Sequence, residues 1–145
     1  MINLNIINHP EHYLLNRFIQ PIDVIEDWSL CHHLACVVKY ICRAGRKNHI
    51  LEDLKKAEWY LVRELSRHQN GFNKCSLALI NHHPLSLEAV LQDWELSTHL
   101  ELTLSNIRRS KNQTLRIDSL IKALISLRAE IQMHQDNLNH RGEKV

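Results

Sequence analysis

The chain has 145 residues, of which 44% are hydrophobic, and a formal net charge of +2. That length suits one domain or two small halves that pack closely, and the near-neutral charge disfavours nucleic acid as a partner. No apolar run approaches the roughly 18 residues of a membrane span. Four cysteines without a regular pairing pattern, and no signal peptide, predict free thiols in a reducing cytoplasm.

The chain is predicted to be all-α, because three glycines and three prolines leave little turn chemistry for strands and hairpins. Pro21 suits the first position of a short helix, and Ser29 is a candidate N-cap for the helix that follows. Gly45 is a candidate end for that second helix. A third helix is expected to begin near Ile50 and to end before Gly71.

The same pattern then starts again 66 residues later. The stretch VIEDWSLCHHL at 24–34 returns as VLQDWELSTHL at 90–100, and 13 of 44 positions are identical when 22–65 is aligned with 88–131. This repeat predicts a tandem duplication of a three-helix unit, whose two copies form a pseudo-twofold helical bundle. The expected domain organisation is a first helical unit at 1–70, a linker at 71–85 and a degenerate second unit at 86–145, packed with the first as one domain.

Positions that are shared by the two units most simply serve the common fold. The repeated Trp28 and Trp94 are therefore expected in the core. Two pairs of shared charged residues are candidate structural ion pairs: Asp27 with Arg43, and Glu64 with Lys56.

A set of polar and aromatic residues in the first unit is missing from the second, although the apolar skeleton is kept. This loss predicts one working site in the first unit and a scaffold role for the second. The residues concerned, each followed by its counterpart, are Lys39 and Ser105, Tyr40 and Asn106, Gly45 and Lys111, Lys47 and Gln113, Asp53 and Ser119, and Tyr60 and Ser126.

Helical spacing places several of these residues on two neighbouring helix faces. Lys39 and Arg43 are four residues apart on one helix. Asp53, Lys56, Tyr60 and Arg63 follow at intervals of three, four and three on the next. Lysine and arginine bind phosphate oxygens, Tyr40, Tyr60 or Trp59 could stack on a base, and Asp53 could orient a sugar hydroxyl, position a lysine or act as a base. The alternative interpretation is a solvated helical surface with ion pairs between residues four apart.

Four short motifs occur in a fixed order between His9 and Leu65: HPEHY, IDVIEDW, KYICRAGRK and EDLKKAEWYL. This stretch resembles the SaV-like, or phage nucleotide-kinase-like, family of small phage and prophage proteins. The resemblance implies nucleotide binding, with phosphorylation of deoxynucleoside monophosphates in one branch. By motif match it assigns nucleotide or phosphate binding to His12, Tyr13, Lys39, Tyr40, Arg43, Lys47 and Tyr60, and catalysis to Asp53 and Lys56.

The chain departs from the family pattern at several points. Members often carry a Gly-Asn pair just before the KY motif, and in this chain Ala35 and Cys36 stand at those positions. The loss of the pair is expected to affect catalysis more than binding. The duplicated second half also differs from the single-unit pattern. No GxxxxGK[ST] loop occurs, so phosphoryl transfer would not use the common phosphate cradle.

The spacing of the candidate ligands disfavours a metal site. The CHHLAC stretch at 31–36 lacks CxxC spacing, and its two cysteines do not share a tight helix face. The acidic residues of EDLKKAE alternate with lysines, whereas a Mg²⁺ site needs several acids that converge. We therefore expect no metal ligand set.

The leading interpretation is a nucleotide-binding phage or prophage protein with a nucleoside-monophosphate-kinase-like role in nucleotide metabolism, in the bacterial host cytoplasm. Two alternatives stay open: a non-enzymatic protein that sequesters a nucleotide signal or host factor to counter anti-phage defence, and a structural interaction protein. The expected partner is a nucleotide or nucleotide-derived small molecule, with ATP or another nucleotide as substrate or ligand. No membrane or nucleic-acid partner is expected, and a homo-oligomer is compatible with the sequence.

Overall fold

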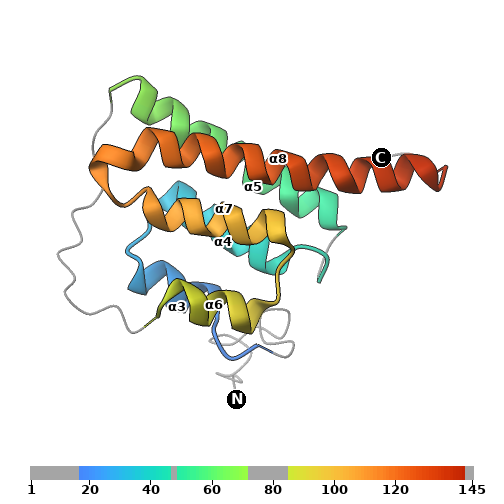
Figure 1. Ribbon diagram of the computed structural model, residues 1–145, viewed down its shortest axis with the longest axis horizontal. Coiled ribbons are helices and arrows are strands. Elements are labelled where there is room, and N and C mark those ends of the chain that lie inside the picture. The colour runs from blue at the N-terminus through green and yellow to red at the C-terminus, as the bar shows by residue number, and fades with distance from the viewer. Residues whose placement is uncertain (1–16, 47–48, 72–84, 143–145) are drawn as a thin grey trace, which may run out of the picture.

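The computed structural model describes residues 17–46, 49–71 and 85–142 (Figure 1). Within these ranges the chain forms helices and turns and contains no strand, which confirms the predicted all-α fold. In chain order the elements are α3 (Pro21–Asp27), α4 (His32–Arg43), α5 (Ile50–Gln69), α6 (Leu87–Trp94), α7 (Thr98–Arg109), the short 3-10 helix η1 (Gln113–Leu115) and α8 (Arg116–His140).

The helices are arranged in three layers (Figure 1). The two long helices α5 and α8 run antiparallel in one layer, α4 and α7 form the middle layer, and the short α3 and α6 form the third. α4 packs on α5, α7 packs on α8, and the most extensive contact between the two halves is that of α5 with α8. One cluster of buried apolar side chains runs through both halves, so they share a single core.

Residues with special backbone or capping properties set the helix ends. Pro21 occupies the first position of α3, where its missing N–H costs nothing. Gly45 follows α4 with a φ of 78°, a left-handed conformation that costs glycine little. Ser86 and Ser97 cap α6 and α7, and each accepts a hydrogen bond from a backbone N–H of the first turn. The sequence-based predictions for Pro21 and Gly45 are confirmed.

The prediction that Ser29 caps α4 is wrong. α4 begins at His32, and Cys31 precedes it in an extended conformation. Ser29 has a φ of 50°, in the left-handed region, and turns the chain between α3 and α4. The chain has to complete this turn before the next helix can begin, which moves the N-cap position on to Cys31.

α6, α7 and α8 repeat the order and spacing of α3, α4 and α5. The first residue of each lies 66 positions after the first residue of its counterpart. The backbone also adopts a left-handed conformation at Ser29 and again at Glu95, which stand 66 positions apart. This is the spacing that a tandem duplication predicts.

The two buried tryptophans make equivalent contacts between the halves. Trp28 donates from Nε1 to the carbonyl oxygen of Leu85 at 3.1 Å, and Trp94 donates from Nε1 to that of Ile19 at 2.8 Å. Their exposed fractions are 1% and 0%, which confirms the prediction that both lie in the core. Reciprocal contacts of this kind are expected where two like surfaces meet.

Candidate functional site

An arginine–aspartate pair joins the end of α4 to the start of α5. Arg43 donates from Nε and Nη2 to Oδ1 of Asp53, at 3.2 and 2.9 Å. Asp53 is fully buried, whereas the Arg43 side chain keeps 15% of its surface exposed. Oδ2 of Asp53 has no hydrogen-bond partner within the described ranges. The buried carboxylate therefore fixes the guanidinium near the surface through a charge-assisted contact.

Three aromatic rings continue from this pair along α4 and α5. The guanidinium carbon of Arg43 lies over Tyr40, 4.8 Å from the ring centroid. Tyr40 stacks on Tyr60, with 6.0 Å between centroids and 18° between ring planes. Tyr60 meets Trp59 edge to face, with their centroids 4.9 Å apart. This series Tyr40–Tyr60–Trp59, called the aromatic row below, offers ring faces and edges to an aromatic ligand.

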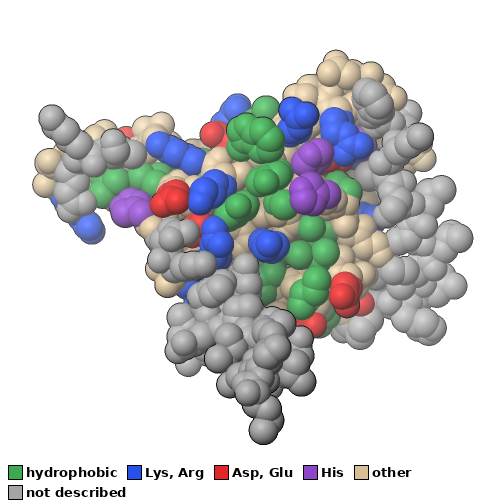
Figure 2. Space-filling view, turned by 180° about the vertical axis from the view of Figure 1, so that it is seen from behind, with side chains coloured by type: hydrophobic (Ala, Val, Ile, Leu, Met, Phe, Trp, Pro, Cys, Tyr) green, Lys and Arg blue, Asp and Glu red, His purple; other side chains and the backbone are tan. Residues whose placement is uncertain are grey.

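Lysine side chains lie beside the aromatic row. Nζ of Lys56 is 5.7 Å from the centroid of Tyr40 and forms an ion pair with Glu52 at 3.0 Å. The hydrogen bond between them raises the pKa of Lys56 and lowers that of Glu52. Lys39 is exposed on α4. Figure 2 views the molecule from behind Figure 1, and on this face lysine, arginine and histidine side chains surround hydrophobic ones.

Six of the nine predicted site residues belong to α4 and α5, and the contacts above link five of them. The sixth, Lys39, lies exposed one turn before Arg43. Asp53 is closed to solvent and contacts Arg43, so its part in this arrangement is to position the arginine. The predicted residues His12, Tyr13 and Lys47 lie outside the described residues.

The second unit presents different side chains at the matching positions. Ser119 stands at the position of Asp53; it is buried, and its hydroxyl has no hydrogen-bond partner in the described part of the chain. Asn106 stands at the position of Tyr40, is buried, and donates to the backbone of its own helix. Arg109 matches Arg43 but is exposed. The second unit therefore lacks the aspartate and the tyrosine that hold the guanidinium in the first.

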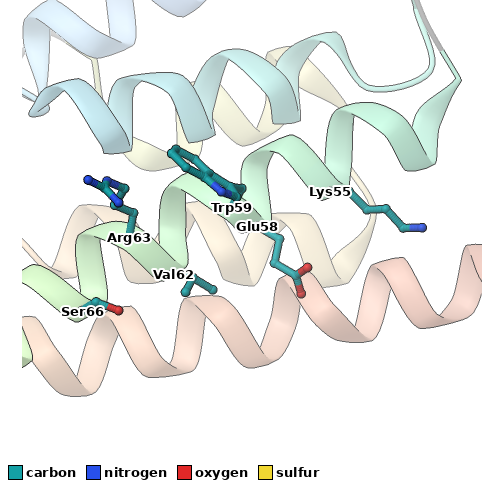
Figure 3. A pocket seen from close by; sticks show the side chains of 6 residues that line it. All are labelled: Lys55, Glu58, Trp59, Val62, Arg63 and Ser66. Atoms are coloured by element: carbon teal, nitrogen blue, oxygen red, sulfur yellow. The ribbon is translucent and has the colours of Figure 1, made fainter.

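A pocket of about 370 Å³ lies on the outer face of α5 (Figure 3). The guanidinium carbon of Arg63 is 5.6 Å from the centroid of Trp59 there. Sequence reasoning named Trp59 as a candidate ring for base stacking and Arg63 as part of the candidate helix face, but it did not predict this pocket. The signal was that Lys55, Trp59 and Arg63 follow at intervals of four, which places them on one helix face. The residues that line the pocket are Lys55, Glu58, Trp59, Val62, Arg63 and Ser66.

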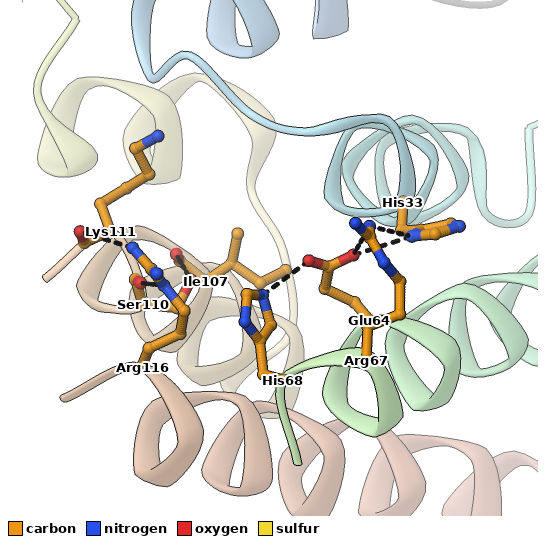
Figure 4. Close-up of polar contacts among 8 residues, drawn as sticks. All are labelled: His33, Glu64, Arg67, His68, Ile107, Ser110, Lys111 and Arg116. Atoms are coloured by element: carbon orange, nitrogen blue, oxygen red, sulfur yellow. Dashed lines mark hydrogen bonds and ion pairs between the residues drawn. The ribbon is translucent and has the colours of Figure 1, made fainter. Parts of the chain in front are cut away.

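A buried carboxylate connects α4 to α5 further along the two helices (Figure 4). Oε2 of Glu64 lies 2.7 Å from Nδ1 of His33 and 3.2 Å from Nη1 of Arg67. Its Oε1 lies 2.8 Å from Nε2 of His68. Burial by itself raises the pKa of Glu64, but the hydrogen bonds with the two histidines and the charge of Arg67 outweigh it, so the pKa lies below the ordinary value.

The second unit repeats this carboxylate–histidine arrangement. Glu130 pairs with His99 and with His134, at 3.1 Å in each case. Sequence reasoning missed this network, although the identity of His33 with His99 and of Glu64 with Glu130 in the 66-residue register was a signal for it. Because it occurs in both units, we assign it to the stability of the shared fold.

The ion pairs expected from shared charged positions have other partners. Arg43 pairs with Asp53 in place of Asp27, which instead accepts a hydrogen bond from the backbone N–H of Leu85 at 3.3 Å. Lys56 pairs with Glu52. The expected partner, Glu64, lies eight residues away on the same helix. Side chains that far apart on one helix are beyond the three- or four-residue spacing at which they meet.

A family model described as a protein of unknown function, DUF3310, matches residues 7–62. This range overlaps the stretch between His9 and Leu65 on which the family resemblance rests, and it contains α3, α4 and most of α5. No curated protein and no solved structure matches the chain.

Of the helices that the structure describes, none is long and apolar enough to cross a membrane. The described residues also contain no group of three or more His, Cys, Asp or Glu side chains that could hold a metal ion. Sγ of Cys36 lies 3.8 Å from Nε2 of His32.

Proposed function

We propose that the α4/α5 surface binds a nucleotide and that the protein has a nucleoside-monophosphate-kinase-like role in phage nucleotide metabolism, in the cytoplasm of a bacterial host. The observation that carries the proposal is the guanidinium of Arg43, which the buried Asp53 holds over the ring of Tyr40. Arginine presents a fork of donors that matches phosphate oxygens. A side chain that is fixed before its ligand arrives loses less freedom on binding, which favours affinity.

Each residue has a role in this proposal. Lys39, Arg43 and Lys56 contact phosphate oxygens. The ring of Tyr60 serves the base, while Asp53 acts through Arg43. The resemblance to the SaV-like family supports the same assignment and adds His12, Tyr13 and Lys47 to it.

We also propose that the two halves arose by tandem duplication and are related by a pseudo-twofold axis. The 66-residue offset of the helix starts and the reciprocal hydrogen bonds of Trp28 and Trp94 support this. In an experimental structure, 21–69 should superpose on 87–135 after a rotation of about 180°. A rotation far from that value would contradict the axis.

The second candidate function is non-enzymatic capture of a nucleotide signal or host factor to counter anti-phage defence. One observation favours it: the acidic side chains beside the cations are already engaged. Asp53 is buried against Arg43, and Glu52 is paired with Lys56. A general base has to reach the proton that it abstracts. Such a site would therefore bind its nucleotide without turnover.

A thermal-shift screen against a nucleotide panel tests both candidates, because a ligand that binds only the native state raises the Tm. We expect at least one nucleotide to do so, and Lys56→Ala to weaken its binding in calorimetry. Transfer of phosphate from ATP to a deoxynucleoside monophosphate would support the kinase role. Binding without transfer would support capture of a nucleotide. No shift with any nucleotide would contradict both the kinase role and nucleotide capture, and would leave capture of a host factor.

A further inference from the structure

The pocket beside Trp59 combines a large exposed indole with a cation on either side of it. Trp59 keeps 57% of its surface exposed, whereas the other two tryptophans are buried. Lys55 and Arg63 lie one turn before and one turn after it, and all three side chains line the pocket (Figure 3). Proteins that bind nucleotides stack the bases on aromatic side chains, while neighbouring cations bind the attached phosphates.

The shared fold does not require this group of side chains. Ile125 holds the matching position to Trp59 in the second unit and is 63% exposed, so the position faces solvent in both units. An indole and its flanking cations are thus a property of the first unit, which also carries the fixed arginine. The counterparts of Lys55, Trp59 and Arg63 are Ile121, Ile125 and Ala129.

The remaining side chains of the pocket are compatible with an anionic aromatic ligand. Glu58 is ion-paired with Arg128 of α8 at 2.8 Å. An exposed pair of this kind adds little stability, but it offsets the negative charge that an incoming phosphate would meet. Val62 supplies apolar surface, and Ser66 supplies a hydroxyl. The volume of about 370 Å³ lies within the range of small-ligand sites.

The aromatic row connects this pocket to the site at Arg43. Trp59 contacts Tyr60, and Tyr60 contacts Tyr40, with centroid separations of 4.9 and 6.0 Å. Aromatic rings that can stack on two bases therefore lie next to each other, and cations lie at both ends of the aromatic row. We infer that the Trp59 pocket is a second base subsite, and that the ligand is a dinucleotide whose first nucleotide occupies the Arg43 site. This inference rests on the proposed nucleotide binding.

The test compares 5′-phosphorylated homodinucleotides with the matching mononucleotides by calorimetry on the full chain. Stacking of one additional base predicts roughly tenfold or tighter binding of a dinucleotide. Trp59→Ala should remove that gain, so that the dinucleotide binds no tighter than the mononucleotide, whereas Trp59→Phe should keep most of it. Ile125→Ala, at the matching exposed position, is the control and should change neither affinity.

Tryptophan fluorescence gives a second measurement. Because Trp28 and Trp94 are buried, ligand contact should affect mainly the emission of Trp59. The dinucleotide should quench part of the wild-type emission and leave the emission of Trp59→Phe unchanged. The mononucleotide should quench the emission of either protein less than the dinucleotide quenches that of wild type.

The outcomes separate this inference from the proposed function. Equal affinity for mononucleotide and dinucleotide, unchanged in Trp59→Ala but weakened in Lys56→Ala, would overturn the dinucleotide inference and leave nucleotide binding standing. A dinucleotide gain that survives Trp59→Ala would also overturn it, since the second base would then lie elsewhere. No binding of any probe would overturn both.

Discussion

Trp28 and Trp94 occupy matching places in the two halves, and each donates its indole N–H to the carbonyl oxygen two residues before the first helix of the other half. Both rings are buried. The hydrogen bonds satisfy the polar edge of a side chain whose remaining surface is apolar. Each half therefore supplies an acceptor that the core of the other half needs.

Truncation of either tryptophan should destabilise the protein strongly. We expect Trp28→Ala and Trp94→Ala each to lower the free energy of unfolding by about 3–5 kcal/mol, since a buried aromatic ring is replaced by a cavity. The measurement is chemical denaturation followed by circular dichroism. Losses below about 1 kcal/mol in both variants would contradict the buried role.

The carboxylate of Glu64 should make stability depend on pH in the acid range. Its pKa in the folded protein lies below the ordinary value of 4.5, so ionised Glu64 stabilises the fold. That contribution is present above the ordinary pKa and is lost as the pH falls through the folded-state pKa. Wild type should therefore lose unfolding free energy relative to Glu64→Gln between about pH 5 and about pH 3.

The control for the pH experiment is an exposed carboxylate. Glu88→Gln, at an exposed position in the first turn of α6, should follow the wild-type curve closely. Urea denaturation at a series of pH values gives each curve. Parallel curves for wild type and Glu64→Gln would show that Glu64 does not contribute in this way.

Phosphate binding on the first unit predicts unequal effects of matched substitutions. Lys39→Ala should weaken nucleotide binding, because it removes a charge-assisted contact worth about 1.5–3 kcal/mol, or roughly 10- to 150-fold in affinity. Arg43→Lys should also weaken it, because lysine keeps the charge but lacks the fork of donors that matches phosphate oxygens. The loss in Lys39→Ala should shrink at high salt, where exposed charges are screened. Calorimetry with the nucleotide found in the screen measures both.

The matching positions of the second unit supply the controls for this prediction. Ser105→Ala and Arg109→Lys should leave nucleotide affinity nearly unchanged. Equal weakening in both units would indicate two sites, or one site across the seam between the halves. The scaffold role predicted for the second unit would then be wrong.

The Arg43–Asp53 pair should respond unequally to loss of either partner. Arg43→Ala leaves a fully buried carboxylate without its cation and should cost about 3–5 kcal/mol. Asp53→Ala leaves a partly exposed guanidinium that can turn to water, and it should cost about 1.5–3 kcal/mol. Denaturation of both single variants and the double variant measures this, and the double variant should lose less than the sum. A larger loss of unfolding free energy in Asp53→Ala than in Arg43→Ala would contradict this prediction.

Local signals in the sequence were enough to predict most of the helical framework. Pro21 and Gly45 act through their own backbone geometry, so their effect on the chain is independent of distant partners. Ser29 failed as a cap because a serine favours both caps and turns, and the spacing of two helices in space decided between them. The aromatic and charged side chains of the site were partly predictable, because helical spacing alone puts Lys39 with Arg43 and Lys56 with Tyr60.

By itself, the sequence determined the helix periods, their main boundaries, the 66-residue repeat and the burial of the repeated tryptophans. Only the tertiary structure decided which side chains meet. It paired Arg43 with Asp53, joined Glu64 to His33, and left Trp59 exposed although Trp28 and Trp94 are buried. The physical reason is that a helix's own period fixes the face on which a side chain lies, whereas its partner and its exposure depend on how separate helices cross and pack.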